Sequence, residues 1–391
     1  MTSLAIVVAG AAALLLIPAT VFFVECVASL FLPAARSVVR RPGASALVLI
    51  PAHDEARGVG ATVEGVRSQL APGDAILVVA DNCTDDTAAR ARAAGAQVIE
   101  RTEPDKRGKG YALTFGVNHL RTRPPDVVIV LDADCRLTPK SIDALVERAI
   151  ETGRPVQADY TFQPAERSAI SMLSSLATVV RNRVRPRGLR RLGQPCHLTG
   201  TGMAFPWGVI RQAPELGAHL VEDLAMGIEL ALEGHAPVLC IEAGTRSELP
   251  TGHQAALQQR RRWEHGQLAT SIEQGPRLVG AGIRRCRLDL IALGMDLMVP
   301  PLALLVGLLV VLFVIATFVI LAGGPPAPAW IAGTALALVT AGVLAGWARY
   351  GRQTISARYL LLAPLYMMWK IPLYLSFLLG RRENQWKRTE R

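Results

Sequence analysis

Two carboxylates, Asp132 and Asp134, stand two residues apart directly after an apolar run. The stretch 126–131 begins with Asp126 and continues with five apolar residues, mostly β-branched, which is typical of a strand buried on both faces of a parallel sheet. Alternate side chains of an extended chain point the same way, so both carboxylates can face one site. Carboxylate oxygens suit a hard divalent cation, and open α/β sheets bind ligands at the carboxyl ends of their strands. The alternative is that the pair caps a helix opening at Thr138 and Pro139.

The elements that must position this pair alternate between short apolar strands and helices. Strand–helix–strand repeats predict an α/β domain, built on a mostly parallel sheet with right-handed crossovers, over residues 43–287. Acidic loops follow the first two strands, at Glu55 and Asp81, and we expect them at the same edge as Asp132. The predicted strands cover residues 46–51, 75–80, 97–101 and 126–131.

Lys109 lies between two glycines and precedes a predicted helix over residues 111–120. A lysine at a helix N-terminus can meet a phosphate with help from backbone N–H groups, and the alternative is a solvated basic loop. The G-x-G-x-x-G pattern of dinucleotide-binding folds and the G-x-x-x-x-G-K-[ST] pattern of P-loops are both missing here. The sequence therefore excludes these two common nucleotide folds.

The two ends of the chain are unusually apolar, and 51% of the 391 residues are hydrophobic. Residues 4–32 exceed the roughly 20 residues needed to cross a bilayer. A cleaved signal peptide is the competing interpretation, but the run is long and no basic region precedes it. Residues 288–322 and 330–348 predict two further membrane-spanning helices, separated by a short turn rich in Gly and Pro.

Arginines flank these segments on one side, which predicts their orientation. By the positive-inside rule the middle of the chain lies in the cytoplasm, so we expect a multi-pass protein of the inner or plasma membrane. The stretch 355–379 differs because Lys370 lies near its middle and Pro364 and Pro372 interrupt it. It is interfacial or re-entrant, or it is a fourth membrane-spanning segment.

Composition also excludes some partners. The net charge is +10, but much of the excess arginine borders the apolar segments, where anionic headgroups explain it. No nucleic-acid-binding motif is present and aromatic residues make up only 5%, so nucleic acid is not an expected partner. The six cysteines lack C-x-x-C spacing, which favours reduced thiols over a disulfide framework or a zinc site.

Several short motifs occur in a fixed order along the chain. They are Pro51-x-x-x-Glu55, Asp81-Asn-Cys-x-Asp-x-Thr87, Gly108-Lys-Gly110, Asp132-x-Asp134, Gly200-Thr-Gly-Met203, Glu222-Asp223 and Gln259-Arg-Arg-Arg262-Trp263. Together they resemble the inverting GT-A glycosyltransferases of family 2, over about residues 47–267. The final motif resembles the membrane-embedded polysaccharide-synthase branch, which makes cellulose, hyaluronan, chitin and poly-N-acetylglucosamine. One departure is Asp54, where the family usually has Asn.

The resemblance implies roles for the donor side of a transfer site. Asp134 is the expected direct ligand of a divalent cation, Mg²⁺ or Mn²⁺, with Asp132 nearer the donor. Glu55 and Asp81 would hold the uracil or ribose, and Lys109 would approach the nucleotide end. A metal and basic side chains would stabilise the diphosphate leaving group.

The resemblance also implies an acceptor side. Asp223 matches the family's catalytic base, and its alternative is an acid that favours the start of a helix over residues 222–233. An arginine can clamp a diphosphate, and a tryptophan offers a flat surface to a sugar ring. The arginine-rich stretch 181–191 either meets lipid headgroups or a lipid-linked acceptor's phosphate, or is simply solvated. The remaining acceptor- or diphosphate-binding candidates are Gly200, Thr201, Gly202, Glu222, Gln259, Arg262 and Trp263.

These expectations describe a membrane-bound, metal-dependent inverting glycosyltransferase of the hexosyl or N-acetylhexosaminyl type. The donor would be a nucleotide-sugar, a UDP-sugar in the first instance. The acceptor would be a growing surface or extracellular polysaccharide, or a lipid-linked glycan that receives a single sugar. Other expected partners are membrane lipids and, because three crossings are few for an export channel, export proteins or a second copy of the chain. A non-catalytic sugar-binding scaffold and a nucleotidyltransferase are the alternatives from other classes.

Overall fold

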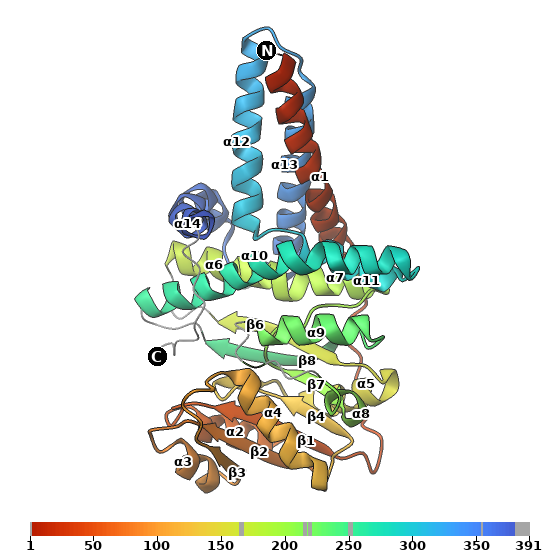
Figure 1. The fold of residues 1–391 in the computed structure, drawn as a ribbon, viewed down its shortest axis with the longest axis vertical. Coiled ribbons are helices and arrows are strands. Elements are labelled where there is room, and N and C mark those ends of the chain that lie inside the picture. Colours follow the sequence, from red (N-terminus) through yellow and green to blue (C-terminus); the bar gives the residue numbers. More distant parts are fainter. Residues whose placement is uncertain are drawn as a thin grey trace. The chain divides into compact units, whose positions relative to one another are not determined.

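The computed structural model describes residues 2–163, 168–213, 217, 221–248, 253–352 and 355–379 (Figure 1). Within α10, the side chains of residues 253–263 lie outside this description. The chain divides into two compact units. Unit 1 comprises Met1–Leu32, Glu166–Gln194 and Glu264–Arg382, and unit 2 comprises Pro33–Ala165, Pro195–Trp263 and Glu383–Arg391.

An eight-stranded sheet in the order β3-β2-β1-β4-β7-β6-β8-β5 forms the centre of unit 2 (Figure 1). The pairs among β3, β2, β1 and β4 are all parallel, as is the pair β6–β8. β7 runs antiparallel to β4 and β6, and β5 runs antiparallel to β8. The strands are β1 Ala46–Ala52, β2 Ala75–Asp81, β3 Gln97–Arg101, β4 Val127–Val130, β5 Cys135–Leu137, β6 Val156–Gln163, β7 Met203–Pro206 and β8 Val238–Glu248.

The central strands are buried on both faces, as their continuous apolar sequences predict. In β1, Val48 and Ile50 belong to one apolar cluster and Leu47 and Leu49 belong to another, on opposite sides of the sheet. Helices cover both sides: α2, α3 and α5 contribute to the first cluster, and α4, α8 and α9 to the second. The helices are α2 Val59–Arg67, α3 Thr87–Ala93, α4 Lys109–His119, α5 Ser141–Thr152, α8 Trp207–Ile210 and α9 Glu222–Leu232, with a 3₁₀ turn, η1, at Leu120–Thr122.

Three helices of unit 1 are long and apolar enough to cross a membrane among the residues described: Ser3–Leu30, Leu302–Leu321 and Ala327–Gly351. They belong to α1 (Thr2–Leu30), α12 (Leu302–Leu321), and α13 (Ala327–Gly346) with its continuation η3 (Trp347–Gly351). The three helices contact one another and run side by side (Figure 1).

The apolar run 288–322 forms two helices, because Pro300 and Pro301 separate α11 (Leu288–Leu297) from α12. Proline lacks a backbone N–H and disfavours helix at the residue before it. Only α12, therefore, has the length and composition of a membrane span.

The other helices of unit 1 include part of the expected cytoplasmic segment 43–287. Residues 166–194 and 264–287 belong to unit 1, because the first segment packs with α1 and the second with α11. A buried ion pair joins them, with Arg185 Nε 2.6 Å from Glu25 Oε2 in α1, and Arg185 also bonds the Asp296 carboxylate. These helices are α6 Ala169–Val179, η2 Val180–Val184, α7 Arg185–Arg191, α10 His253–Arg284, η4 Ala357–Leu362 and α14 Ala363–Leu378.

The C-terminal segment holds its lysine by a buried ion pair. Lys370 in α14 bonds Glu264 of α10, and the Lys370 ammonium lies 5.2 Å from the centre of the Tyr366 ring. His265 Nε2 lies 3.1 Å from the Leu373 carbonyl oxygen, so two neighbouring residues of α10 contact α14. The position of Lys370 within an apolar stretch is explained by this pair, and α14 is not among the three candidate spans.

Candidate active site

Lys109 and Asp132 meet at the carboxyl edge of the sheet. Gly108 precedes α4 with φ 139°, a conformation that favours glycine, and Lys109 is the first residue of the helix. The Lys109 ammonium bonds the Asp132 carboxylate and donates to the Gly200 carbonyl oxygen at 2.5 Å. Burial opposes the charge of Lys109, but the carboxylates of Asp132 and Glu222 outweigh burial and raise its pKa above the ordinary value. Lys109 is therefore a permanent cation at neutral pH.

Asp132 and Asp134 form a group of possible metal ligands together with Cys135. One ligand atom from each residue lies within 4.8 Å of the others. Burial raises the pKa of the Cys135 thiol to about 12, so the thiol is protonated at neutral pH in the metal-free protein. Carboxylate oxygens, which Asp132 and Asp134 supply, are the ligands that Mg²⁺ or Mn²⁺ prefers.

The loop Gly200–Gly202 lies against this group because β7, which follows it, pairs with β4. Thr201 is fully buried, and its Oγ1 accepts a hydrogen bond from the Asp132 backbone N–H at 3.0 Å. Gly202 has φ 63°, and a Cβ there would lie 2.1 Å from Thr245 Oγ1. The loop approaches β8 so closely at Gly202 that only glycine fits.

A buried glutamine that sequence analysis missed supports the same loop. Gln157 in β6 donates from Nε2 to the Thr201 carbonyl oxygen at 2.9 Å, and its Oε1 accepts from the Thr199 N–H at 2.9 Å. A buried amide with both ends bonded fixes the loop backbone. A polar residue within an apolar strand, as in Val156-Gln157-Ala158, was the available signal.

Glu222 and Asp223 open α9, as expected, and face the lysine from the second half of the domain. Glu222 Oε1 lies 4.0 Å from Lys109 Nζ. Burial raises the pKa of Glu222 to about 7, although Lys109 opposes this shift. A Cβ added at Gly200 would lie 3.3 Å from Asp223 Oδ2, so Asp223 borders the glycine loop. The structure thus brings together Lys109, Asp132, Gly200, Glu222 and Asp223.

Asp81 ends β2 and is almost fully buried beside a cation. Its Oδ1 lies 2.5 Å from Arg101 Nη1, and Arg101 also donates to the Lys106 carbonyl oxygen at 2.9 Å. The Arg101 guanidinium lies 5.4 Å from the centre of the Tyr111 ring. Arg101 is a second residue that sequence analysis missed, since an arginine that closes a strand usually lies in solvent.

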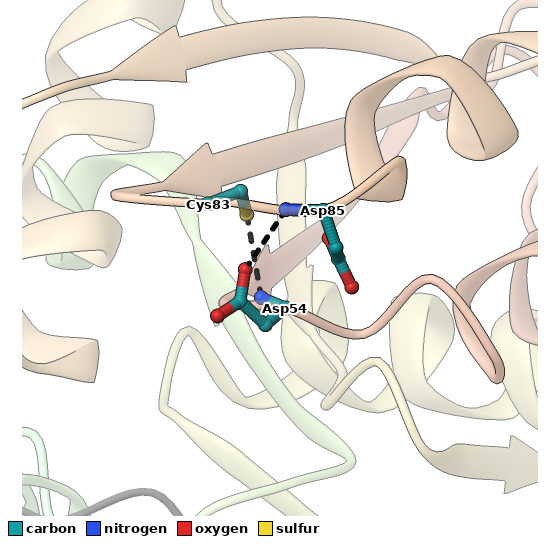
Figure 2. A group of neighbouring side chains, drawn as sticks. All are labelled: Asp54, Cys83 and Asp85. Carbon is teal, nitrogen blue, oxygen red and sulfur yellow. Dashed lines mark hydrogen bonds between the residues drawn. The ribbon is translucent and has the colours of Figure 1, made fainter.

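The loops after β1 and β2 are joined by hydrogen bonds around Asp54 (Figure 2). Asp54 has φ 53°, and its Oδ1 accepts from the backbone N–H groups of Thr84 at 2.6 Å and Asp85 at 3.3 Å. Asp54, Cys83 and Asp85 could themselves hold a metal, but this carboxylate already braces the loop. An Asn Oδ1 could accept the same bonds, so the departure at Asp54 preserves the loop's hydrogen bonding.

Glu55 lies in this braced loop, and its backbone N–H donates to Thr87 Oγ1 at 2.7 Å. Thr87 is fully buried, so the bond fixes the turn that carries Glu55. Gln259, Arg262 and Trp263 lie within one and a half turns of helix α10, as their spacing predicts. The side chains of these three residues lie outside the described part of the structure.

Known proteins share parts of this sequence and fold. Residues 42–266, more than half of the chain, match the family model described as Glycosyltransferase like family 2. A 101-residue segment is 35% identical to glucosyl-3-phosphoglycerate synthase of Mycolicibacterium paratuberculosis, and it covers 24% of this chain and 30% of that relative. The chain thus matches less than a third of the relative's length.

Two solved structures are similar. One is a mannosyltransferase from Pyrobaculum calidifontis in complex with GDP-Man and Mn²⁺, with TM-score 0.54, 17% identity, and coverage of 94% of this chain and 99% of that one. The other is glucosyl-3-phosphoglycerate synthase from Mycobacterium tuberculosis, with TM-score 0.38, 22% identity, and coverage of 57% and 78%. The first likeness confirms the predicted α/β fold of the GT-A type with accompanying apolar helices. The family match confirms the predicted family, and the chain belongs to the glycosyltransferase-like family 2.

Proposed function

We propose that this chain transfers a sugar, with inversion, from a nucleoside-diphosphate sugar to an acceptor held at a membrane. The observation that carries the proposal is the convergence of Lys109 with Asp132, Gly200 and Glu222 in a domain of this family. These residues come from the ends of separate elements and place a cation, carboxylates and a glycine loop around one point. Such an arrangement suits a reaction in which negative charge develops on a departing diphosphate.

The donor side consists of Asp132, Asp134 and Lys109. Asp132 and Asp134 would hold Mg²⁺ or Mn²⁺, which when bound stabilises the negative charge of the leaving diphosphate. Lys109 adds a fixed positive charge beside them. The mannosyltransferase of similar fold was solved with GDP-Man and Mn²⁺, which supports this class of donor and cofactor. Glu55 and Asp81 would contact the base or ribose, with Arg101 orienting the Asp81 carboxylate.

The acceptor side consists of the glycine loop and the start of α9. We assign the role of general base to Asp223, whose carboxylate would take the proton of the acceptor hydroxyl. Gly200 has no side chain, so an acceptor hydroxyl can approach Asp223 closely. Gln259, Arg262 and Trp263 on α10 would bind the diphosphate and an acceptor sugar ring.

We propose that the acceptor is a lipid-linked glycan or a membrane-tethered polysaccharide, and that the domain works on the cytoplasmic side of the cell membrane. The three candidate spans support membrane attachment. Three candidate spans, the number found in the described part of the chain, are few for an export channel, which favours transfer of single sugars to a lipid-linked acceptor. The Q-x-x-R-W motif in α10 favours the second candidate, a processive polymer synthase.

The test uses the full chain, purified into lipid nanodiscs and incubated with panels of UDP- and GDP-sugars, Mn²⁺, and lipid extract as acceptor. We expect release of one nucleoside diphosphate together with a sugar-modified lipid or a polymer, separated by size. Absence of nucleotide release with every donor, with and without acceptor, would refute the proposal. The size of the product distinguishes single transfer from polymer synthesis.

A further inference from the structure

A cavity of about 580 Å³ lies in unit 2, between α2 and the start of α5. We call it the rear cavity, and its lining includes Thr62, Gly65, Gln69, Arg136, Lys140 and Asp143. None of these residues belongs to the proposed transfer site. The volume is within the range of small-molecule sites, roughly 300–1,000 Å³.

The rear cavity carries surplus positive charge. Arg136 and Lys140 are exposed, and neither side chain has an ion pair or hydrogen bond within the described part of the chain. The acidic residue of the lining, Asp143, already has a cationic partner outside the cavity, because its Oδ1 lies 3.6 Å from Arg40 Nη1. Arg40 is held in turn by Asp74 at 2.6 Å. The two unpaired cations are thus available to an anion.

A third cation lies beside this pair. Arg136 in β5 is directly opposite Arg246 in the antiparallel strand β8, and both side chains are exposed. Directly opposed residues of an antiparallel pair point to the same face, and like charges there destabilise the pairing. An anion bound at this corner would offset that repulsion.

The rear cavity is connected to the loop that carries the two aspartates. Thr62 Oγ1 donates a buried hydrogen bond of 2.7 Å to the Ala133 carbonyl oxygen. Ala133 lies between Asp132 and Asp134, so a wall of the cavity holds the backbone of the proposed metal loop from behind. A ligand that moves α2 would act on this loop through a single bond.

We propose that the rear cavity binds a small phosphorylated metabolite, with its phosphate between Arg136 and Lys140 and its remainder against Gly65. Ligand binding there alters sugar transfer through the Thr62–Ala133 hydrogen bond. This second step rests on the proposed function, whereas binding itself does not.

The binding test is calorimetry on the full chain in phosphatidylcholine nanodiscs, with glycerol 3-phosphate as the probe and no donor present. Arg136→Gln and Lys140→Gln should each weaken binding about tenfold, because each removes a charge-assisted contact. Gly65→Leu should block the cavity without touching a charge, since a Cβ at Gly65 meets nothing within 4 Å. Arg123→Gln, which removes an exposed arginine outside the cavity, is the matched control and should bind normally.

Three outcomes overturn the site. The first is no measurable binding, and the second is binding unchanged in both Arg136→Gln and Gly65→Leu. The third is loss of binding in the presence of saturating UDP, with the variants normal, which would place the anion in the donor site instead. Repeating the titration in phosphatidylglycerol nanodiscs separates the sources of phosphate. Equal affinity for glycerol 3-phosphate in both lipids supports a soluble ligand. Competition between phosphatidylglycerol and the probe would show that the site binds a lipid headgroup and would overturn the soluble ligand.

The coupling test measures transfer at increasing glycerol 3-phosphate. We expect a change in kcat or donor KM that Gly65→Leu abolishes and that Thr62→Val reduces while binding persists. An unchanged rate at saturating probe would overturn the coupling. If the chain transfers no sugar at all, the binding titrations still decide whether the rear cavity is a site.

Discussion

The Lys109 ammonium lies 4.0 Å from the Glu222 carboxylate and, on its other side, bonds the Asp132 carboxylate. One lysine thus joins the D-x-D loop after β4 to the start of α9, which also carries Asp223. The proposed donor and acceptor motifs come from two separate segments of unit 2, residues 33–165 and 195–263, and this contact brings them together.

Asp223→Asn should lower the rate of transfer by a factor of 10² to 10⁴, on the order expected for a missing general base. The amide keeps the shape of the side chain but cannot accept the acceptor's proton, so nucleotide binding should stay close to normal. Initial rates and UDP or GDP titrations check both points. Glu233→Gln, at the exposed end of the same helix, is the control and should be fully active. An active Asp223→Asn enzyme would show that the base is a different group.

Glu222→Gln should stabilise the protein above pH 7 and have little effect near pH 4.5. The folded-state pKa of Glu222 is raised from 4.5 to about 7 by burial, so the folded protein holds this proton more tightly than the unfolded chain. Its contribution to the free energy of unfolding therefore falls as pH rises from 4.5 to about 7, and then stays constant. The gain at pH 8 should be on the order of 3 kcal/mol. Thermal melting of both proteins from pH 5 to 8 measures it, and a pH-independent difference would contradict the prediction.

Asp134→Asn should weaken Mn²⁺ binding at least tenfold, because it replaces a charged oxygen ligand with a neutral one. Cys135→Ala is the matched control, since the adjacent thiol stays protonated and should not be a ligand. Electron paramagnetic resonance of free Mn²⁺ measures binding directly. Chelation should abolish transfer, and Mg²⁺ or Mn²⁺ should restore it. If Cys135→Ala weakened binding as much as Asp134→Asn, the carboxylate assignment would be wrong.

Arg101→Leu should destabilise unit 2 by about 3 kcal/mol, because it leaves the Asp81 carboxylate buried and unpaired. Adding Asp81→Leu should recover part of that loss, since no buried charge then remains. Arg92→Leu removes an arginine from an exposed pair with Glu100 and should cost less than about 1 kcal/mol. Thermal unfolding of the three variants, with donor affinity measured in parallel, distinguishes a buried pair from a surface one. Equal losses for Arg101→Leu and Arg92→Leu would count against burial as the cause.

Lys370→Leu should lower the melting temperature in detergent, because it leaves Glu264 as an uncompensated buried charge. The double variant Lys370→Leu with Glu264→Leu should be closer to the original protein. Hydrogen exchange along α10 should increase in the single variant and return toward normal in the double one. Arg358→Leu, which removes an exposed cation of the same unit, provides the baseline. A double variant as unstable as the single one would exclude charge burial as the reason.

Half of the sheet could be predicted from the sequence because β1, β2 and β4 are buried on both faces. Their continuous apolar runs and the short β3 matched the structure to within one residue at either end. The strands that pair antiparallel on the other side could not be placed the same way. β7 has four residues and β5 has three, and their pairing depends on contacts distant in sequence.

The convergence of Lys109 with Asp132 followed from a general rule, that ligands bind at the carboxyl ends of parallel strands. The supporting residues Gln157 and Arg101 did not, because a polar residue in a strand normally faces water. Burial of each depends on partners that only the folded chain supplies: two loop backbone groups for Gln157 and Asp81 for Arg101. Lys370 is a similar case, because it lies in an apolar stretch and its partner in α10, Glu264, is distant in sequence.

The bond from Lys109 to the Gly200 carbonyl oxygen has a consequence for synthesis on the ribosome. Chains fold from the N-terminus as they emerge, and the strands β1 to β4 can assemble first. Until Gly200 and Glu222 have left the exit tunnel, Lys109 lacks two of its three neighbours and Asp223 is absent. A nascent chain can therefore form β1 to β4 and their carboxyl edge before the proposed transfer site exists. The site is complete only after the later segment that contains α9 has folded onto this edge.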